Sequence, residues 1–327
     1  MRRMLLSMVA ALALVGEAAA DDLTWGDVVT RAAAGCDAFT PVFHDGNHYT
    51  SYGDCVGFDG TGIKLSMGFG RIIGGPANAT VEDLPTPDLR FIGDRDKGKK
   101  PSSALIVGNR MYIWVRNYAP NGTQSRLKYS NNFTSSSNST WEWSPFWFYN
   151  ISYPVFVQGA PGCSGGYIYM VVHDSTSAYT PANRFVLMRA PASKLLERSA
   201  YEFFNGTPAS PSWSKLYRER KSIFTAPGKC YRSGMSYNAV RQRYYWWQNW
   251  SNSAQPDSFR VWSGPNPWGP WTRIFFTSKW EMDPGERGEF PVAWMGKEPI
   301  SQPGTLHLLF SGNDQLTIRR ATVAAGF

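Results

Sequence analysis

Apolar and aromatic residues alternate with polar ones over short stretches of this chain, and Gly, Pro, Asn and Asp separate the stretches. An alternation with a period of two predicts β-strands, whereas long stretches with helical periodicity are few. One unit recurs five times: a turn, an apolar or aromatic strand, and a polar residue at the strand's end. The five copies span 44–54, 107–117, 164–174, 240–250 and 303–314.

The copies are anchored on Tyr49, Tyr112, Tyr169, Tyr245 and Leu308. They lie roughly 55 to 75 residues apart, which is about the length of one four-stranded blade. The spacing therefore predicts an all-β fold, a five-bladed β-propeller. Because no linker or composition break follows residue 20, we expect residues 21–327 to form a single domain. A short helical pattern at 192–204 is expected to be an inserted turn.

Residues 1–20 are typical of a secretory signal peptide. Arg2 and Arg3 precede a short apolar stretch, and small residues follow at Ala18–Ala20. The apolar stretch is too short for a membrane anchor, and Glu17 interrupts it. No later segment is long and apolar enough to span a membrane. We therefore expect a secreted, extracellular protein.

Four cysteines follow the signal segment: Cys36, Cys55, Cys163 and Cys230. An even number in an oxidising compartment predicts two disulfides, with three possible pairings. Zinc binding is the alternative, but no C-x-x-C pair supports it, so no metal is expected. A bridge at Cys55 would fix the end of the strand that carries Asp54.

Seven N-x-S/T triplets predict a glycoprotein from a eukaryote. The alternative is that Asn, Ser and Thr simply mark β-turns. The candidate glycosylation sites are Asn78, Asn121, Asn132, Asn138, Asn150, Asn205 and Asn249.

The formal net charge of +8 is spread along the chain, with basic patches at 95–100 and 218–221. A scattered charge on a secreted chain argues against nucleic-acid binding and favours a solvated basic face. Attraction to an anionic polysaccharide stays open. We find no P-loop, Rossmann fingerprint or nucleophile elbow, so we expect neither a cofactor nor serine chemistry.

The inner strands of a propeller converge on its axis, so polar residues at strand ends are expected to meet in one funnel. Such a concave site with several hydrogen-bonding groups suits a polyhydroxylated ligand. The strand-end residues are Asp54, Asn117, Asp174, Asn249 and Asn313, the last followed by Asp314.

Two carboxylates are the minimum for hydrolysis of a glycosidic bond, because one protonates the leaving oxygen and the other attacks or activates water. Asp54 is the first candidate, since it follows a strand. Asp45 is its proposed partner, although Asp45-Gly46 is also a hairpin turn signal. Glu289 is the other candidate partner, on an acidic Gly/Pro loop at 280–291 that also holds Glu281, Asp283 and Glu286. The alternative is that these four carboxylates are solvated, because carboxylates on loops are more often exposed to solvent than catalytic.

Two aromatic groups are also informative. Trp268 and Trp271 lie in a Pro-rich turn, where we expect them to pack between blades; a sugar-stacking platform is the alternative. Residues 244–247 are consecutive aromatics, which predicts a strand buried on both faces. The ends of that strand could still contact a sugar.

The stretch HYTSYGDCVGFDGTGIKLSMGFGRIIGG (48–75) resembles secreted proteins of domain-of-unknown-function family 4185. The likeness continues through 126–143, 156–160, 184–206 and 236–247 and covers most of the chain after residue 20. The resemblance implies a five-bladed propeller, and some family members are similar to endo-acting hydrolases of D-arabinan that use acidic residues in the funnel. By position, Asp45 and Asp54 match the family's acidic first-blade motif. Cys55 stands where the family usually has glycine.

The leading hypothesis is a secreted glycoside hydrolase that acts on a polysaccharide as a monomer, with Asp54 and either Asp45 or Glu289 as the catalytic pair. A non-catalytic carbohydrate-binding propeller is the alternative. A polysaccharide lyase is a third reading, with His173 or Tyr49 as its base.

Overall fold

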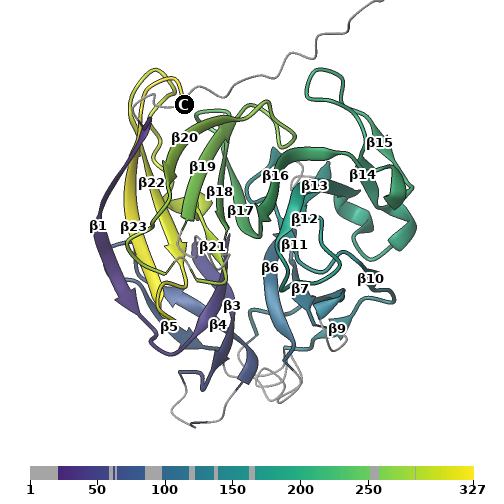
Figure 1. The fold of residues 1–327 in the computed structure, drawn as a ribbon. Coiled ribbons are helices and arrows are strands. Elements are labelled where there is room, and N and C mark those ends of the chain that lie inside the picture. The colour runs from purple at the N-terminus through teal and green to yellow at the C-terminus, as the bar shows by residue number, and fades with distance from the viewer. Residues whose placement is uncertain are drawn as a thin grey trace, which may run out of the picture.

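The chain forms five antiparallel β-sheets arranged in a ring, as the ribbon of the computed structural model shows (Figure 1). The prediction of an all-β, five-bladed propeller is confirmed. The structure describes residues 21–327 except 59–61, 63–64, 85–97, 118–121, 136–138, 162–165, 251–257 and 284.

Each blade begins at the axis with its innermost strand and continues outward. The innermost strands of blades one to five are β2 (Asp37–His44), β6 (Lys100–Val107), β11 (Pro154–Phe156), β17 (Arg232–Asn238) and β21 (Gly288–Glu289). The second strands are β3 (Asn47–Cys55), β7 (Arg110–Arg116), β12 (Tyr167–His173), β18 (Arg243–Trp250) and β22 (Gly304–Phe310). The recurring unit of the sequence is therefore the second strand of every blade, one strand away from the axis.

The outer half of each blade is more variable. The third strands are β4 (Leu65–Ile73), β8 (Gln124–Ser130), β13 (Ala182–Pro191), β19 (Ser258–Gly264) and β23 (Leu316–Val323). The outer strands are β5 (Thr80–Asp83), β9 (Glu142–Trp143), β10 (Phe148–Tyr149), β14 (Glu202–Phe204), β15 (Trp213–Ser214), β16 (Ser222–Cys230), β20 (Thr272–Thr277) and β1 (Leu23–Ala32).

Strand β1 closes the ring. It comes first in the chain, yet it pairs antiparallel with β23 and completes the fifth blade. Figure 1 shows purple β1 beside yellow β23. Residues from both ends of the described chain thus share one sheet.

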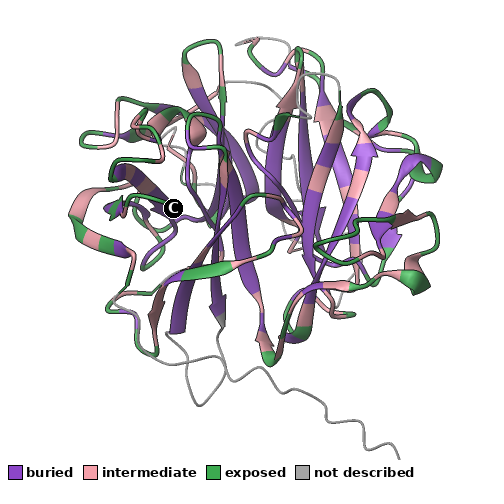
Figure 2. Ribbon diagram, turned by 90° about the horizontal axis from the view of Figure 1, so that it is seen from above, coloured by how far each residue is buried: buried purple, intermediate pink, exposed green. Residues whose placement is uncertain are grey.

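Five large hydrophobic clusters hold the blades together, one between each pair of neighbouring blades. Leu105 and Trp114 of the second blade, for example, meet Met170 and Met188 of the third. Burial is greatest along the inner strands, whereas the connecting turns are exposed (Figure 2). The core is therefore a ring of interfaces between neighbouring blades.

Strand β18 is buried on both faces, as its run of aromatic residues predicts. Tyr245 and Trp247 pack toward the fifth blade, while Tyr244 and Trp246 pack toward the third. Trp271 lies 5.0 Å from Trp246, measured between ring centroids. Trp268 stacks on Phe204 of the third blade. Both tryptophans of the Pro-rich turn thus pack between blades.

The helical pattern at 192–204 becomes two short 3₁₀ turns, η4 (Ala192–Lys194) and η5 (Arg198–Ala200), followed by β14. The segment connects two strands of the third blade, as expected of an inserted turn.

Candidate functional site

Charged side chains gather where the innermost strands begin. Asp37, Lys100 and Arg232 are the first residues of β2, β6 and β17. Arg116 ends β7 beside the start of β6, and Glu286 lies two residues before the start of β21. We call these five residues the axial cluster. Four blades contribute to it, because propeller geometry brings the inner strand ends together.

Glu286 is the centre of the axial cluster. Its Oε2 accepts hydrogen bonds from Nε and Nη2 of Arg232, at 2.8 and 2.5 Å. Nη2 of Arg116 lies 3.1 Å from the same oxygen. Burial alone would raise the pKa of Glu286, but Arg232 and Arg116 outweigh it and lower the pKa to about 2. Glu286 is thus a fixed anion whose side chain is still 35% exposed.

Asp37 experiences the opposite shift. Burial raises its pKa to about 6, even though Arg116 and Lys100 act to lower it. Its Oδ1 lies so close to Gly53 that a Cβ there would be 3.1 Å away. No described residue forms a hydrogen bond with this oxygen, which is buried. The axial cluster therefore holds one carboxyl group that is ionised and another that can carry a proton near pH 6.

The position of Asp37 is fixed by its neighbours in the chain. Cys36 forms a disulfide with Cys55, which ties the start of β2 to the end of β3. The backbone N–H groups of Gly35 and Cys36 donate to the carbonyl of Asp314, in the β22–β23 turn. The disulfide thus stabilises the site as well as the blade.

Asp54 lies at the rim of the axial cluster. Its carboxylate forms an ion pair with Lys100, and its side chain is 39% exposed. Burial and the neighbouring Arg116 lower the pKa of Lys100. Asp54 therefore lies at the end of the propeller where the strand-end residues were expected to meet. Its partner Lys100 belongs to the basic patch at 95–100, which we had expected to be solvated.

Tyrosine rings surround the two arginines. The guanidinium carbon of Arg116 lies 5.2 Å from the ring centroid of Tyr153 and 5.3 Å from that of Tyr179. Arg232 lies over Tyr153 and Tyr231. Tyr179 is 46% exposed, so one aromatic ring of the site faces solvent.

Asp45 and Glu289 do not join Asp54. Asp45 is an exposed residue of the β2–β3 turn, at the other end of β3. A strand rises about 3.3 Å per residue, so Asp45 and Asp54 are separated by roughly the length of β3. Glu289 is fully buried; it forms an ion pair with Arg287 and accepts a 2.6 Å hydrogen bond from Ser236 Oγ. Neither residue therefore contacts Asp54 in this structure.

The other predicted strand-end residues lie at the same end of the propeller, and three of the four make internal contacts. Nδ2 of Asn117 donates to the Tyr179 hydroxyl and to the carbonyl of Gly98. Asp174 is buried in ion pairs with Arg184 and Arg220. Asn249 is buried and donates to the carbonyl of Gly285 at 3.3 Å. Asn313 is an exposed turn residue beside Asp314.

The predicted modification sites fall into three groups. Asn78 and Asn150 are exposed, and Asn132 and Asn205 are partly exposed, so all four can accept a glycan. Asn249 is only 4% exposed, and its amide nitrogen is already bonded, which makes it a poor acceptor. Asn121 and Asn138 lie outside the described residues.

Of the two disulfides expected, Cys36–Cys55 is confirmed. Cys230 is instead a buried free thiol, and burial raises its pKa to about 11. Cys163 and the predicted signal peptide at 1–20 lie outside the described residues.

The two residues named for lyase chemistry are not positioned as bases in the axial cluster. Tyr49 is buried in the hydrophobic cluster between the first and second blades. His173 is buried, and burial together with Arg232 lowers its pKa to about 4. With its Nε2 protonated, His173 donates to the carbonyl of Ser177 at 3.0 Å.

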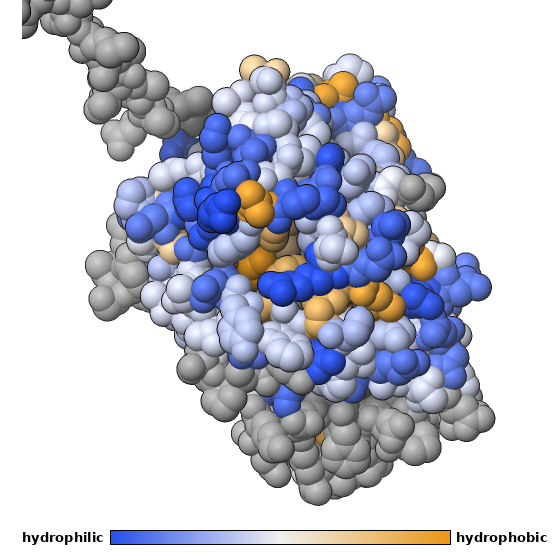
Figure 3. All heavy atoms as spheres, turned by 90° about the vertical axis from the view of Figure 1, so that its right-hand side faces the viewer, coloured by the Kyte–Doolittle hydropathy of each residue, from blue (hydrophilic) through white to orange (hydrophobic). Residues whose placement is uncertain are grey.

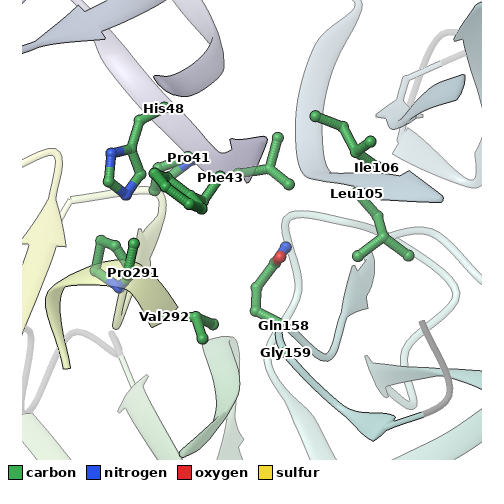
Figure 4. A pocket seen from close by; sticks show the side chains of 11 residues that line it. Pro41, Phe43, His48, Leu105, Ile106, Gln158, Gly159, Pro291 and Val292 are labelled. Carbon is green, nitrogen blue, oxygen red and sulfur yellow. The ribbon is translucent and has the colours of Figure 1, made fainter. Parts of the chain in front are cut away.

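A hollow of about 250 Å³ lies at the opposite end of the axis. Figure 4 shows Phe43 and Ile106, near the ends of β2 and β6, and the side chain of Gln158 facing it. Its lining is mostly apolar and contains no carboxylate. His48 is the titratable residue of this lining, so the hollow lacks the carboxylates of the axial cluster.

Figure 3 shows one outer side of the molecule. Hydrophilic residues cover most of that side, and its hydrophobic patches are small. Within the described chain, no three His, Cys, Asp or Glu side chains lie close enough to hold a metal ion. No helix among the described residues is long and apolar enough to cross a membrane.

Comparisons with known proteins found similar structures but no similar sequences. No family model and no curated protein matches the sequence, so the resemblance to family 4185 stays a prediction. Among solved structures, the chain is similar to an exo-β-1,3-galactanase from Phanerochaete chrysosporium in complex with β-1,3-galactotriose. The TM-score is 0.52 at 10% identity, over 89% of this chain and 63% of that one.

The same galactanase with galactose gives a TM-score of 0.51 at 9% identity, over 86% of this chain and 59% of that one. An α-L-arabinofuranosidase from Podospora anserina gives 0.49 at 10% identity, over 93% and 98% of the two chains. The likeness to the galactanase establishes a shared propeller fold.

Proposed function

We propose that this protein is a secreted glycoside hydrolase that cleaves a polysaccharide at the axial cluster. Asp37 is its acid–base residue and Glu286 its permanently charged carboxylate. The observation that carries the proposal is the opposite pKa shift of the two groups, to about 6 and about 2. Two carboxyl groups with separated pKa values can divide the acid and anion roles of glycoside hydrolysis.

In this mechanism Asp37, when protonated, gives its proton to the glycosidic oxygen. The bond between that oxygen and the anomeric carbon breaks, and water supplies the new hydroxyl group while its spare proton returns to Asp37. Glu286 lies beside the positive charge that develops on the sugar ring. Arg116 and Arg232 hold Glu286 in place, since both contact its Oε2.

The surroundings suit a sugar ligand. Tyr179 presents an exposed ring next to Arg116, and aromatic rings bind the apolar faces of sugars. The structurally similar galactanase binds galactose and β-1,3-galactotriose, which supports a carbohydrate ligand for this propeller. Endo-acting cleavage of an arabinan-like or other polysaccharide is the finer form of the proposal.

The test is incubation of the purified protein with plant, fungal and bacterial glycans, arabinans included. New reducing ends without ultraviolet absorption are expected, because hydrolysis leaves saturated products. Unsaturated, ultraviolet-absorbing products would contradict hydrolysis and show that the protein is a lyase.

A non-catalytic glycan-binding protein is the second candidate. The observation in its favour is that Glu286 is already bound by two arginines and Asp37 is only 8% exposed. Glycan binding without new reducing ends, in a titration that is unchanged by Asp37→Asn, would favour this function.

A further inference from the structure

Arg116 has hydrogen-bonding groups that the described protein does not use. Its guanidinium is 1% exposed, and only Nη2 reaches Glu286. Nε and Nη1 are buried and have no hydrogen-bond partner among the described residues. A buried donor without a partner is energetically costly, and more so when it is charged. By contrast, Nε, Nη1 and Nη2 of Arg232 all bond to Glu286 or Ala178.

The residue that follows offers an unused acceptor. Oδ1 of Asn117 is buried and has no partner in the described part of the chain, although its Nδ2 makes two hydrogen bonds. Charged donors on Arg116 and an amide acceptor on Asn117 thus lie together at the end of β7. A ligand that satisfies both groups carries an oxyanion and a hydroxyl group.

Lys100 adds a second cation to the same place. Its side chain is 17% exposed, and its charge acts on both Asp37 and Glu286. Tyr179, whose ring covers one side of the Arg116 guanidinium, is itself 46% exposed.

We propose that the axial cluster binds an acidic sugar, with Arg116 and Lys100 contacting its oxyanion and Asn117 Oδ1 accepting from a neighbouring hydroxyl. The oxyanion is a uronate carboxylate or a sulfate ester. Arginine is the residue best suited to this, because its planar donors match carboxylate and sulfate oxygens. This inference rests on the proposed function in placing the sugar at the axial cluster, but it concerns binding and not cleavage.

The experiment measures calorimetric binding of three galactose-based oligosaccharides of equal length: neutral galactan, oligogalacturonate and sulfated galactan. Binding of an anionic probe at least tenfold tighter than of the neutral one is expected, and the stronger of the two identifies the oxyanion. Equal affinity for all three, or binding to none, would overturn the inference.

Variants locate the binding. Arg116→Lys keeps the charge but removes the guanidinium donors, so the loss of affinity is expected to be at least tenfold larger for the anionic probe than for the neutral one. Arg218→Gln removes an exposed cation from the 218–221 patch and serves as the matched control for bulk charge. If Arg116→Lys does not fold, Lys100→Gln decides, with a threefold or greater loss expected. Unchanged binding in the folded variant that is tested would contradict the inference.

The two proposals fail differently. Tight binding of an acidic probe with no cleavage of any glycan would support the acidic-sugar inference and contradict the hydrolase proposal. Cleavage of a glycan together with equal affinity for the three probes would support the hydrolase proposal and contradict the proposed binding of an acidic sugar.

Discussion

The polar residues at the strand ends owe their identity partly to backbone conformation. Asp54, Asn117 and Asn313 all have φ between 50° and 60°. Asp and Asn tolerate this left-handed region better than other residues with a side chain. A polar residue at the end of a second strand is therefore first a turn residue, and its contact with the funnel has to be established separately.

Asp37 predicts the pH dependence of the reaction. If the protonated form donates the proton, kcat/KM falls about tenfold per pH unit above roughly pH 6. Burial sets this pKa, with Arg116 and Lys100 opposing it and Glu286 and Asp314 adding to it. The measurement is a pH–rate profile from pH 5 to 8. A rate that rises through pH 6 would contradict the acid role of Asp37.

Two buried histidines predict a loss of stability in acid. Burial lowers the pKa of His48 and of His173 to about 4, so the unfolded chain binds more protons than the folded one between about pH 6.5 and 4. Each histidine then costs on the order of 3 kcal/mol as the pH falls through this range. Asp37 acts in the opposite direction, because burial raises its pKa.

The measurement is urea denaturation of the wild type and of His173→Gln at pH 7 and pH 4.5. The variant keeps a side-chain donor for Ser177 but does not titrate, so its free energy of unfolding should fall less on acidification. An equal fall in both proteins would show that His173 does not titrate as described.

At the scale of elements, the second strands were predictable and the innermost strands were not. Strands β11 and β21 have three and two residues, too few to show an alternation. Strand β17 has small residues near the axis: a Cβ on Gly234 would lie 2.6 Å from the carbonyl oxygen of Gly288. Because the axis is crowded, the innermost strands carry Gly and Ser in place of an alternating apolar pattern. The recognisable sequence pattern therefore belongs to the second strands, whereas the site lies on the innermost ones.

The Cys36–Cys55 disulfide contributes to the stability of the fold and also to the position of Asp37. Cys36 and Cys55 are 19 residues apart, and closing a loop of that length stabilises a protein by about 3 kcal/mol in the chain-entropy model. A Cys36→Ala/Cys55→Ala variant should lose about this free energy of unfolding. It should also lose activity, because Asp37 follows Cys36 directly.

Denaturation with and without a thiol reductant checks this prediction. Reductant should destabilise the wild type and the control variant Cys230→Ala, but not the double variant. Equal sensitivity of all three proteins would assign the effect to something other than the Cys36–Cys55 bond.

At the scale of the whole molecule, ring closure makes the site. The recurring unit and its count were enough to predict five blades, but the cluster needs residues far apart in sequence. Asp37, which no motif singled out, comes near Glu286 of the fifth blade because β1 and β23 complete the ring. No sequence pattern marked Arg116 or Arg232 as site residues. The sequence also named Glu286, as one of several loop carboxylates, without a signal that set it apart from Glu289.

The same geometry explains why the first hypothesis for the catalytic pair was wrong. Asp45 and Asp54 flank one strand, so the chain between them is extended and cannot fold back. A propeller brings together residues at one end of different strands, and it separates residues at the two ends of one strand.

The most direct test of the account compares glycan cleavage by the wild type, Asp37→Asn and Asp45→Asn. Both substitutions remove one carboxylate with almost no change in volume, and asparagine suits the left-handed conformation of Asp45. The account predicts that Asp37→Asn lowers kcat/KM by about 10²–10⁴-fold while Asp45→Asn leaves it unchanged. Full activity in Asp37→Asn, or an equal loss in Asp45→Asn, would contradict a catalytic site at the axial cluster.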